Sequence, residues 1–150
     1  MAAGDHITIR RARPSDLDDL VTLSGEYCIA DGHPVDADLA RRGFAPLLES
    51  DERGTVFIAH ADDTALGYAV VCWSWSIEIG GFEVVLDEIY TRPKGTGLGS
   101  RLIAALEDEC RERGVLRIFL ETERPNVRAR ELYARHGYTE DDSIWMSKEL

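Results

Sequence analysis

The sequence has few cysteines and no long apolar run, and both shortages limit what the protein can be. Its 150 residues include only three cysteines, Cys28, Cys72 and Cys110. Because they are odd in number and widely spaced within apolar patterns, we expect buried free thiols rather than a disulfide framework or a metal site. No apolar run approaches the roughly 18 residues of a membrane span, and the polar start does not resemble a signal peptide. The sequence therefore predicts a cytoplasmic protein that needs no metal.

Positive charge is also scarce. There are 17 Lys and Arg against 28 Asp and Glu, which gives a formal net charge of −11. Such an excess of acid argues against nucleic acid or an anionic membrane as a partner. Ten of the basic residues nevertheless lie between Arg92 and Arg135, which indicates a local site for an anionic ligand. The sequence contains no repeat, linker or low-complexity segment, so we expect a single domain over residues 1–150.

Hydrophobic periodicity predicts a mixed α/β order along the whole chain. Strands are expected at residues 6–13, 55–61, 65–79, 82–91 and 116–122, with two more short strands after Tyr138. Helices are expected from residue 14 to Gly32, at 36–48 with interruptions at Gly43 and Pro46, after Gly99, and after Asn126. Gly80 and Gly81 are expected to turn the third strand into the fourth.

The chain is organised around residues 84–113, which read as a strand, a glycine-rich turn and a helix. Glycines let successive backbone N–H groups converge, and the unpaired N–H groups at a helix start add partial positive charge. The order therefore predicts a phosphate site, although an ordinary tight turn would show the same glycines. The spacing fits neither a P-loop, which needs Lys followed by Ser or Thr, nor a dinucleotide fingerprint, since Ser100 and Leu102 occupy the two possible third-glycine positions.

Two segments together resemble a known family. K-G-T-G-L-G-S-R-L at positions 94–102 is similar to R/Q-G-x-G-x-G-[ST]-x-L, the acetyl-coenzyme A signature of the GNAT superfamily of N-acetyltransferases. Residues 126–138 are similar to the second family motif, N-x-x-A-x-x-L-Y-x-x-x-G-[FY]. Without the family, this second segment is a short amphipathic helix that Asn126 caps and Gly137 ends. Two long motifs in the family's order are much harder to obtain by chance than either one alone.

The resemblance implies the GNAT fold, a mixed and mostly antiparallel sheet flanked by helices and splayed between its fourth and fifth strands. It implies acetyl-coenzyme A as the acetyl donor, held in that gap without a metal. The backbone of the fourth strand would pair with the pantetheine arm, and Ile89 N–H would donate to the thioester carbonyl. The residues that the resemblance assigns to cofactor binding are Ile89, Tyr90, Thr91, Lys94, Gly95, Thr96, Gly97, Leu98, Gly99, Ser100, Arg101, Asn126, Ala129 and Tyr133.

The chain departs from the family pattern before the glycines. Pro93 and Lys94 are adjacent, whereas the family usually places about two more residues between the proline and the first signature residue. Lys94 also replaces the preferred Arg or Gln, so it supplies charge without a guanidinium fork. We expect this shorter turn to affect the affinity for the cofactor or the shape of the loop.

The resemblance assigns Tyr133 as the general acid that protonates the departing thiolate, although it could also be a packed aromatic residue. Some family members use a Glu as the general base at the position where this chain has Val85. Others use an acidic residue two positions before the oxyanion donor, which is Asp87 here. Strict alternation puts Asp87 and Ile89 on one face of the strand and Glu88 on the other, but a bulge would exchange these faces. Asp87 is slightly favoured over Glu88, while a water chain or a salt bridge from either carboxylate stays open.

The acceptor site is expected at the end of the first helix and on the long hairpin. Its candidate residues are Tyr27, Asp31, His33, Trp73, Trp75 and Glu78, with core packing favoured for the tryptophans and simple exposure for His33. The motifs describe the donor, so they leave the acceptor unnamed. We expect a small cationic amine, and a homodimer is left open. Two alternatives remain: a non-catalytic acetyl-coenzyme A module, and an acetyltransferase that acts on a protein amine.

Overall fold

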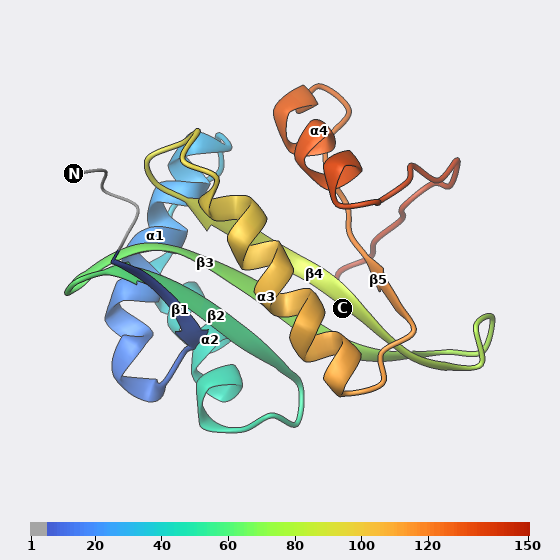
Figure 1. Ribbon diagram of the computed structural model, residues 1–150, viewed down its shortest axis with the longest axis horizontal. Helices are drawn as coiled ribbons and strands as arrows, with labels where there is room; N and C mark the ends of the chain where they lie inside the picture. The colour runs from blue at the N-terminus through green and yellow to red at the C-terminus, as the bar shows by residue number, and fades with distance from the viewer. Residues whose placement is uncertain (1–5) are drawn as a thin grey trace.

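The protein is built on one five-stranded sheet that is covered by helices on both faces (Figure 1). The computed structural model describes residues 6–150. Neighbouring strands follow chain order: β1 (Ile7–Arg11), β2 (Gly54–Ala61), β3 (Thr64–Ser76), β4 (Gly81–Thr91) and β5 (Arg117–Phe119). The helices are the 3₁₀ turn η1 (Pro14–Asp16), α1 (Leu17–Ala30), α2 (Ala37–Glu49), α3 (Leu98–Glu112) and α4 (Val127–Arg135). Every helix within residues 6–150 is too short or too polar to span a bilayer.

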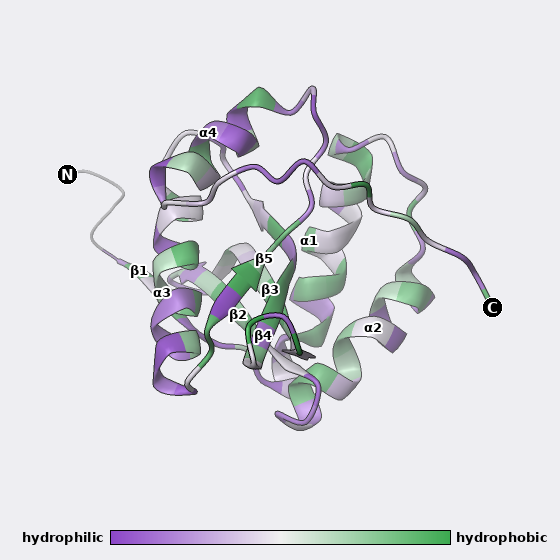
Figure 2. Ribbon diagram, turned by 90° about the vertical axis from the view of Figure 1, so that its right-hand side faces the viewer, coloured by the Kyte–Doolittle hydropathy of each residue, from purple (hydrophilic) through white to green (hydrophobic). Residues whose placement is uncertain are grey.

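The sheet separates two cores. On one face, α1 and α2 pack Leu20, Leu23 and Phe44 against Tyr68 and Tyr90 of the strands. On the other face, the apolar stripe of α3 covers a second group of buried strand residues, as its spacing in the sequence predicts. Figure 2 shows this layering from the side, with α3 on one side of the strands and α1 and α2 on the other.

The sheet opens between β4 and β5, which confirms the expected splay. β1 to β4 pair antiparallel, whereas β4 and β5 pair in parallel over a short stretch that ends at Val85 and Phe119. β4 continues to Thr91, so beyond Val85 it has no strand beside it on that edge within residues 6–150. Backbone groups along this edge of β4 are thus available to a ligand.

A β-bulge at Asp87 decides which way the strand's acidic residues point. Val70 pairs with Glu88 and Val71 pairs with Leu86, which leaves Asp87 as the extra residue. Tyr90 packs with the core under α1 and α2, while Leu86 and Ile89 pack with the core under α3. Strict alternation is therefore wrong for the end of this strand, and the bulge that the sequence left open is confirmed.

Three further expectations differ from the structure. Residues 138–150 contain no helix or strand, so the prediction of two final strands is wrong. Apolar residues of this segment are not buried, since Ile144 and Met146 are 88% and 87% exposed, and no strand within residues 6–150 pairs with the outer edge of β5. α2 runs without interruption through Gly43 and Pro46 because its apolar face, including Phe44 and Leu48, is buried against the sheet. The fifth strand is shorter than expected and stops at Phe119, where it diverges from β4 after the pair Val85 and Phe119.

Candidate active site

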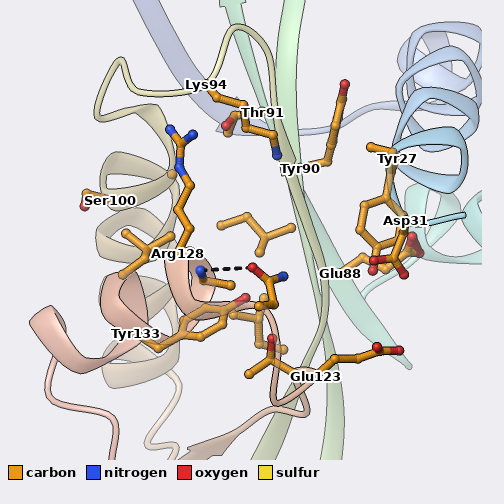
Figure 3. A pocket seen from close by; sticks show the side chains of 18 of the residues that line it. Tyr27, Asp31, Glu88, Tyr90, Thr91, Lys94, Ser100, Glu123, Arg128 and Tyr133 are labelled. Atoms are coloured by element: carbon orange, nitrogen blue, oxygen red, sulfur yellow. Dashed lines mark hydrogen bonds between the residues drawn. The ribbon is translucent and has the colours of Figure 1, made fainter.

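A cavity of about 630 Å³ occupies the place where β4 loses its neighbour (Figure 3). Six parts of the chain wall it. These are β4 from Val85 to Thr91, the loop and helix start at residues 94–100, the α4 region from Asn126 to Arg135, the end of α1 at Tyr27, Ala30 and Asp31, the chain after β5 at Phe119 and residues 121–123, and Trp145. Both motifs found in the sequence therefore face one space, although they lie in separate elements.

The glycine turn forms one end of this cavity. Gly95 and Gly97 have φ angles of 82° and 77°, in the left-handed region that L side chains rarely adopt, and Gly97 caps α3. A Cβ on Gly99 would lie 3.3 Å from Leu132, so this glycine lets α4 pack closely on α3. The start of α3 thus exposes its backbone N–H groups to the cavity wall, as an anion site requires.

Two basic side chains accompany the glycines. Lys94 and Arg128 both line the cavity, and neither forms an ion pair within residues 6–150. Desolvation lowers the pKa of Lys94, and the nearby charge of Arg128 lowers it further. Two like charges without acidic partners repel each other until an anion joins them. This end of the cavity therefore carries positive charge that no ion pair within residues 6–150 compensates.

Lys94 is anchored to α1 through Tyr90. Its Nζ lies 4.9 Å from the centre of the Tyr90 ring, and the Tyr90 hydroxyl donates to Glu26 at 3.2 Å. Arg92 donates to the other oxygen of Glu26 and also to the carbonyl of Ala65 at the start of β3. Helix α1 and the segment that leads into the glycine turn are thus held together by one carboxylate, that of Glu26.

Glu88 lies within the cavity wall, half-buried, and accepts a hydrogen bond from Tyr68 Oη at 3.1 Å. Burial raises its pKa and the charge of Asp87 raises it further, while the bond from Tyr68 opposes both. Asp87 also lines the cavity but its side chain is exposed. The bulge thus brings two carboxylates to one place, of which Glu88 is the less hydrated.

Two tyrosines line the cavity from the helices. Tyr133 of α4 is half-buried, and burial raises its pKa, so its phenol stays protonated at neutral pH. Tyr27 of α1 packs edge to face on Tyr90, with ring centroids 6.2 Å apart. Burial, together with the charges of Asp31 and Glu88, raises the pKa of Tyr27 to about 12. Both phenols can therefore donate a hydrogen bond into the cavity.

The cavity has one acidic end and one basic end. Away from Lys94 and Arg128, its lining includes one further cation, Arg135, against the carboxylates of Asp31, Asp87, Glu88, Glu121 and Glu123, together with the rings of Phe119 and Trp145. Of these carboxylates only Asp31 has an ion-pair partner within residues 6–150, His33 at 2.8 Å. Carboxylates elsewhere, such as Asp16 and Glu83, are paired with arginines. The uncompensated negative charge favours a cation at this end.

Most of the residues expected at the site line this cavity, but five do not. Arg101 donates to the Ile7 carbonyl, and His33 contacts Asp31 behind the cavity wall. Trp73 packs on Phe82 and donates to the Asp51 carbonyl, in a second, shallower hollow. Trp75 is 71% exposed. Glu78 lies beside Arg117. The hairpin thus points away from the opening of the sheet.

Several residues at or next to the site escaped the sequence analysis. Arg128 lies inside the second motif and among the ten basic residues between Arg92 and Arg135. The sequence therefore showed its charge but not that its side chain lines the cavity. Glu123 and Trp145 come from segments without regular structure, for which periodicity gives no signal. Glu26 and Tyr68 read as ordinary helix and strand residues. Their connection to the site becomes visible only in the structure, where Glu26 pairs with Arg92 and Tyr68 donates a hydrogen bond to Glu88.

Comparison with known proteins first gives the class. Solved structures that share this fold over nearly the whole chain include a possible acetyltransferase from Clostridium difficile 630 and an aminoglycoside N-acetyltransferase, AAC(6')-Iy, in complex with CoA. That structure is 22% identical with a TM-score of 0.81 and covers 97% of this chain and 96% of its own. The chain belongs to the acetyltransferase (GNAT) family, whose sequence profile matches residues 17–138.

Two other proteins are similar over most of their length. The uncharacterized N-acetyltransferase YhfO of Bacillus subtilis is 27% identical over 137 residues, which cover 90% of this chain and 91% of YhfO. The integron cassette protein HFX_CASS3, from the mobile metagenome of Cole Harbour Salt Marsh, is also 27% identical. Its structure has a TM-score of 0.84 and covers 95% of this chain and 90% of its own.

The residues present fit the family's donor, acetyl-CoA. The left-handed glycines and the start of α3 offer N–H groups for a pyrophosphate, and Lys94 and Arg128 are two cations without acidic partners. The free edge of β4 offers backbone groups to the amides of a pantetheine arm. Asn126, in contrast, uses its side-chain oxygen to cap α4 by accepting from Ala129 N–H at 3.2 Å. Its contribution to binding would therefore come through the start of that helix.

Proposed function

We propose that the protein transfers the acetyl group of acetyl-CoA to a primary amine of a small cationic molecule. The observation that carries the proposal is the polarity of the cavity, which is basic at the glycine turn and acidic beside Glu88. An anionic donor and a cationic acceptor would enter such a site at opposite ends. Acetyl-CoA supplies an acetyl thioester, and the chain's own residues orient the two reactants and move protons.

Glu88 is the proposed base. A free alkyl ammonium has a pKa of about 10.4, so it must lose a proton before it can attack. The bulge turns Glu88 toward the face covered by α1, where Tyr27 and Asp31 stand, and desolvation raises its pKa toward that of a useful base. Asp87, at the exposed side of the same bulge, is proposed to draw the ammonium in and is the alternative base.

Tyr133 is the proposed general acid. When the amine nitrogen bonds to the acetyl carbon, the carbon–sulfur bond breaks and the sulfur needs a proton. The ammonium nitrogen loses two protons in all as it becomes an amide nitrogen. Glu88 would take the first before the attack and pass it to solvent. Tyr133 would give its phenolic proton to the sulfur and then recover the second proton from the nitrogen. Ile89 N–H is the proposed donor to the acetyl oxygen, because β4 lacks a neighbour on that edge.

The negative end of the cavity supports the cationic acceptor. Asp87, Glu88, Glu121 and Glu123 have no basic partner within residues 6–150, and Tyr27 and Trp145 add aromatic faces that favour cations. The aminoglycoside acetyltransferases that share the fold act on amines of this general kind, as their names state. A protein amine is the second candidate, since another protein of the same fold is a ribosomal-protein-alanine N-acetyltransferase.

A library of amines tests the proposal. Purified protein is mixed with acetyl-CoA and single amines, and free thiol is followed. Polycationic amines should be acetylated best, with a rate that falls as salt is added, because the attraction to the acidic end is screened. If no amine releases thiol while CoA still binds, the protein is a non-catalytic acetyl-CoA module. Preference for peptides over small amines would favour the protein-directed alternative.

The base is tested with Glu88→Gln and Asp87→Asn. Glu88→Gln should lower kcat at neutral pH and lose less at high pH, where more of the amine is already neutral. Asp87→Asn should raise the KM for the amine while kcat changes little. The reverse pattern would make Asp87 the base. If the pH–rate profiles of both variants match that of the wild type between pH 6 and 10, neither carboxylate is the base.

A further inference from the structure

Tyr68 lies directly behind Glu88 and outside the cavity lining. Its side chain is fully buried, and its hydroxyl donates to Glu88 Oε1 at 3.1 Å. The ring packs edge to face on Phe44, with centroids 5.5 Å apart, and lies 6.5 Å from the ring of Tyr90. Packing on both sides fixes the ring, so the hydroxyl has little freedom to choose another direction. Tyr68 cannot contact a ligand, but it contacts the residue that does.

The bulge is what creates this contact. In the register of β3 and β4, Tyr68 pairs with Tyr90 and Val70 pairs with Glu88. Tyr68 and Glu88 are therefore diagonal neighbours on one face, a separation that a tyrosine and a glutamate can bridge. Without the extra residue at Asp87, Glu88 would point toward the core under α3, away from Tyr68 on the other face of the sheet. The same irregularity supplies both the carboxylate and its donor.

We propose that Tyr68 is a positioning residue for the proposed base: its hydroxyl holds Glu88 Oε1, and Glu88 Oε2 stays free to take the proton of the acceptor amine. The inference rests on the role of Glu88 given under the proposed function. Burial raises the pKa of Tyr68, so its hydroxyl keeps the proton that it donates to Glu88, and nearby Ser24 of α1, itself buried, only partly opposes this rise.

Charge around Glu88 explains why such a donor is needed. Asp87 of β4 adds negative charge beside it. Tyr27 and Asp31 of α1 and Cys72 of β3 share its surroundings. Tyr133 of α4 lines the same cavity. None of these is a cation, so burial and the carboxylates all favour the protonated form of Glu88. A hydrogen bond to the ionised form opposes that effect. Tyr68 thus favours the ionised form of a half-buried carboxylate, which is the form that can take a proton from the amine.

The direct test is a carboxyl titration of the free protein, without substrates. Glutamate is labelled with ¹³C at the side-chain carboxyl, the Glu88 signal is assigned by its loss in Glu88→Gln, and its pKa is read by NMR in wild type and Tyr68→Phe. Loss of a hydrogen bond to the charged form should raise the pKa of Glu88 by about one unit. The acid limb of kcat/KM should move to higher pH by the same amount, so the rate falls at low pH and recovers at high pH.

A matched control separates this effect from general loss of stability. Thr55→Val removes another buried hydroxyl from the sheet, one that accepts from Arg11 outside the cavity lining, and should leave the Glu88 titration unchanged. In the wild type, the ¹³Cζ signal of Tyr68 should also follow the Glu88 titration with the same midpoint. That measurement needs no variant and holds even if Tyr68→Phe folds poorly.

The outcomes distinguish the two proposals. An unchanged pKa of Glu88 in folded Tyr68→Phe, or a Tyr68 signal that does not follow Glu88, overturns the inference. If Glu88→Gln keeps the acid limb, the base is wrong, yet the titration of the free protein still decides whether Tyr68 controls Glu88. A raised pKa in Tyr68→Phe together with a shifted acid limb supports both.

Discussion

The ammonium of Lys94 lies 4.9 Å from the centre of the Tyr90 ring, and the hydroxyl of that ring donates to Glu26 on α1. A cation over an aromatic face is stabilised by the ring's negative face. Tyr90 also packs on Tyr27. The loop proposed to bind phosphate and the helix proposed to bind the acceptor thus touch the same side chain. Several predictions about donor binding depend on this position of Lys94.

Lys94→Met should weaken CoA binding by about tenfold, because one charge-assisted bond to the pyrophosphate is lost while the aliphatic stem over Tyr90 remains. Calorimetry at low and high salt measures the change, and the variant should depend less on salt than wild type. Arg111→Met is the control, since Arg111 pairs with Glu107 and Asp108 on the exposed side of α3. Equal losses in both variants would point to net charge rather than to a specific site.

The affinity for CoA should also fall as pH rises above neutrality, earlier than an ordinary lysine would allow. Desolvation and Arg128 lower the pKa of Lys94, and a bound phosphate stabilises its charged form. The protonated form binds, so affinity is full below this pKa and declines as pH passes through it. Binding measured between pH 7 and 10 should show the decline in wild type. Lys94→Met should lack that decline, and a decline that persists there belongs to another group.

Gly97→Val should abolish most of the affinity for CoA. The residue has a φ angle of 77°, which costs a β-branched residue about 1–2 kcal/mol. No protein atom lies within 4 Å of a Cβ placed there, so the side chain would occupy the space left for the phosphates. Gly114→Val is matched to it, with a φ angle of 76° and equally open surroundings at the far end of α3. Both variants should lose similar stability, and only Gly97→Val should lose binding.

Tyr133→Phe should keep CoA binding and lower kcat by about 10²–10⁴-fold, the range of a lost general acid. Burial raises the pKa of Tyr133, so its proton is present below its usual value of about 10 and no alkaline loss of activity at pH 8 to 9 should come from this group. Tyr138→Phe is the control, because its ring packs 5.9 Å from Tyr133 but outside the cavity lining. An unchanged kcat in Tyr133→Phe would return that residue to a packing role.

Much of the donor end of the site could be predicted from the sequence. The strand, the glycine turn and the helix at residues 84–113 are contiguous, and local rules govern each of them: β-branched residues form the strand, glycines take positive φ, and a stripe of leucines faces the sheet. Asn126 and Gly137 likewise mark the ends of α4 by capping chemistry that needs no tertiary contact. These features also carry the family resemblance.

The acceptor end could not be predicted in the same way, because it is assembled from side chains far apart in the chain. Trp73 and Trp75 read as hairpin candidates, but the hairpin extends away from the opening of the sheet. Trp145 was not a candidate, yet it reaches the cavity from a segment without regular structure and packs on Phe119. The sequence shows which residues are polar or aromatic, but which of them lie together in the folded protein depends on the topology of the chain.

The sequence by itself determined the order of the elements up to α4, the glycine-rich turn before α3 and the family, since local propensities and short motifs encode them. Only the tertiary structure decided which carboxylate faces the α1 side. A single extra residue at Asp87 shifts the register between Val70 and Val71, and a shift of one residue reverses every side chain beyond it. Whether a strand bulges depends on pairing with its neighbour and on the cores on both faces. For that reason Glu88 could join Tyr68 only once β3, β4 and α1 had packed together.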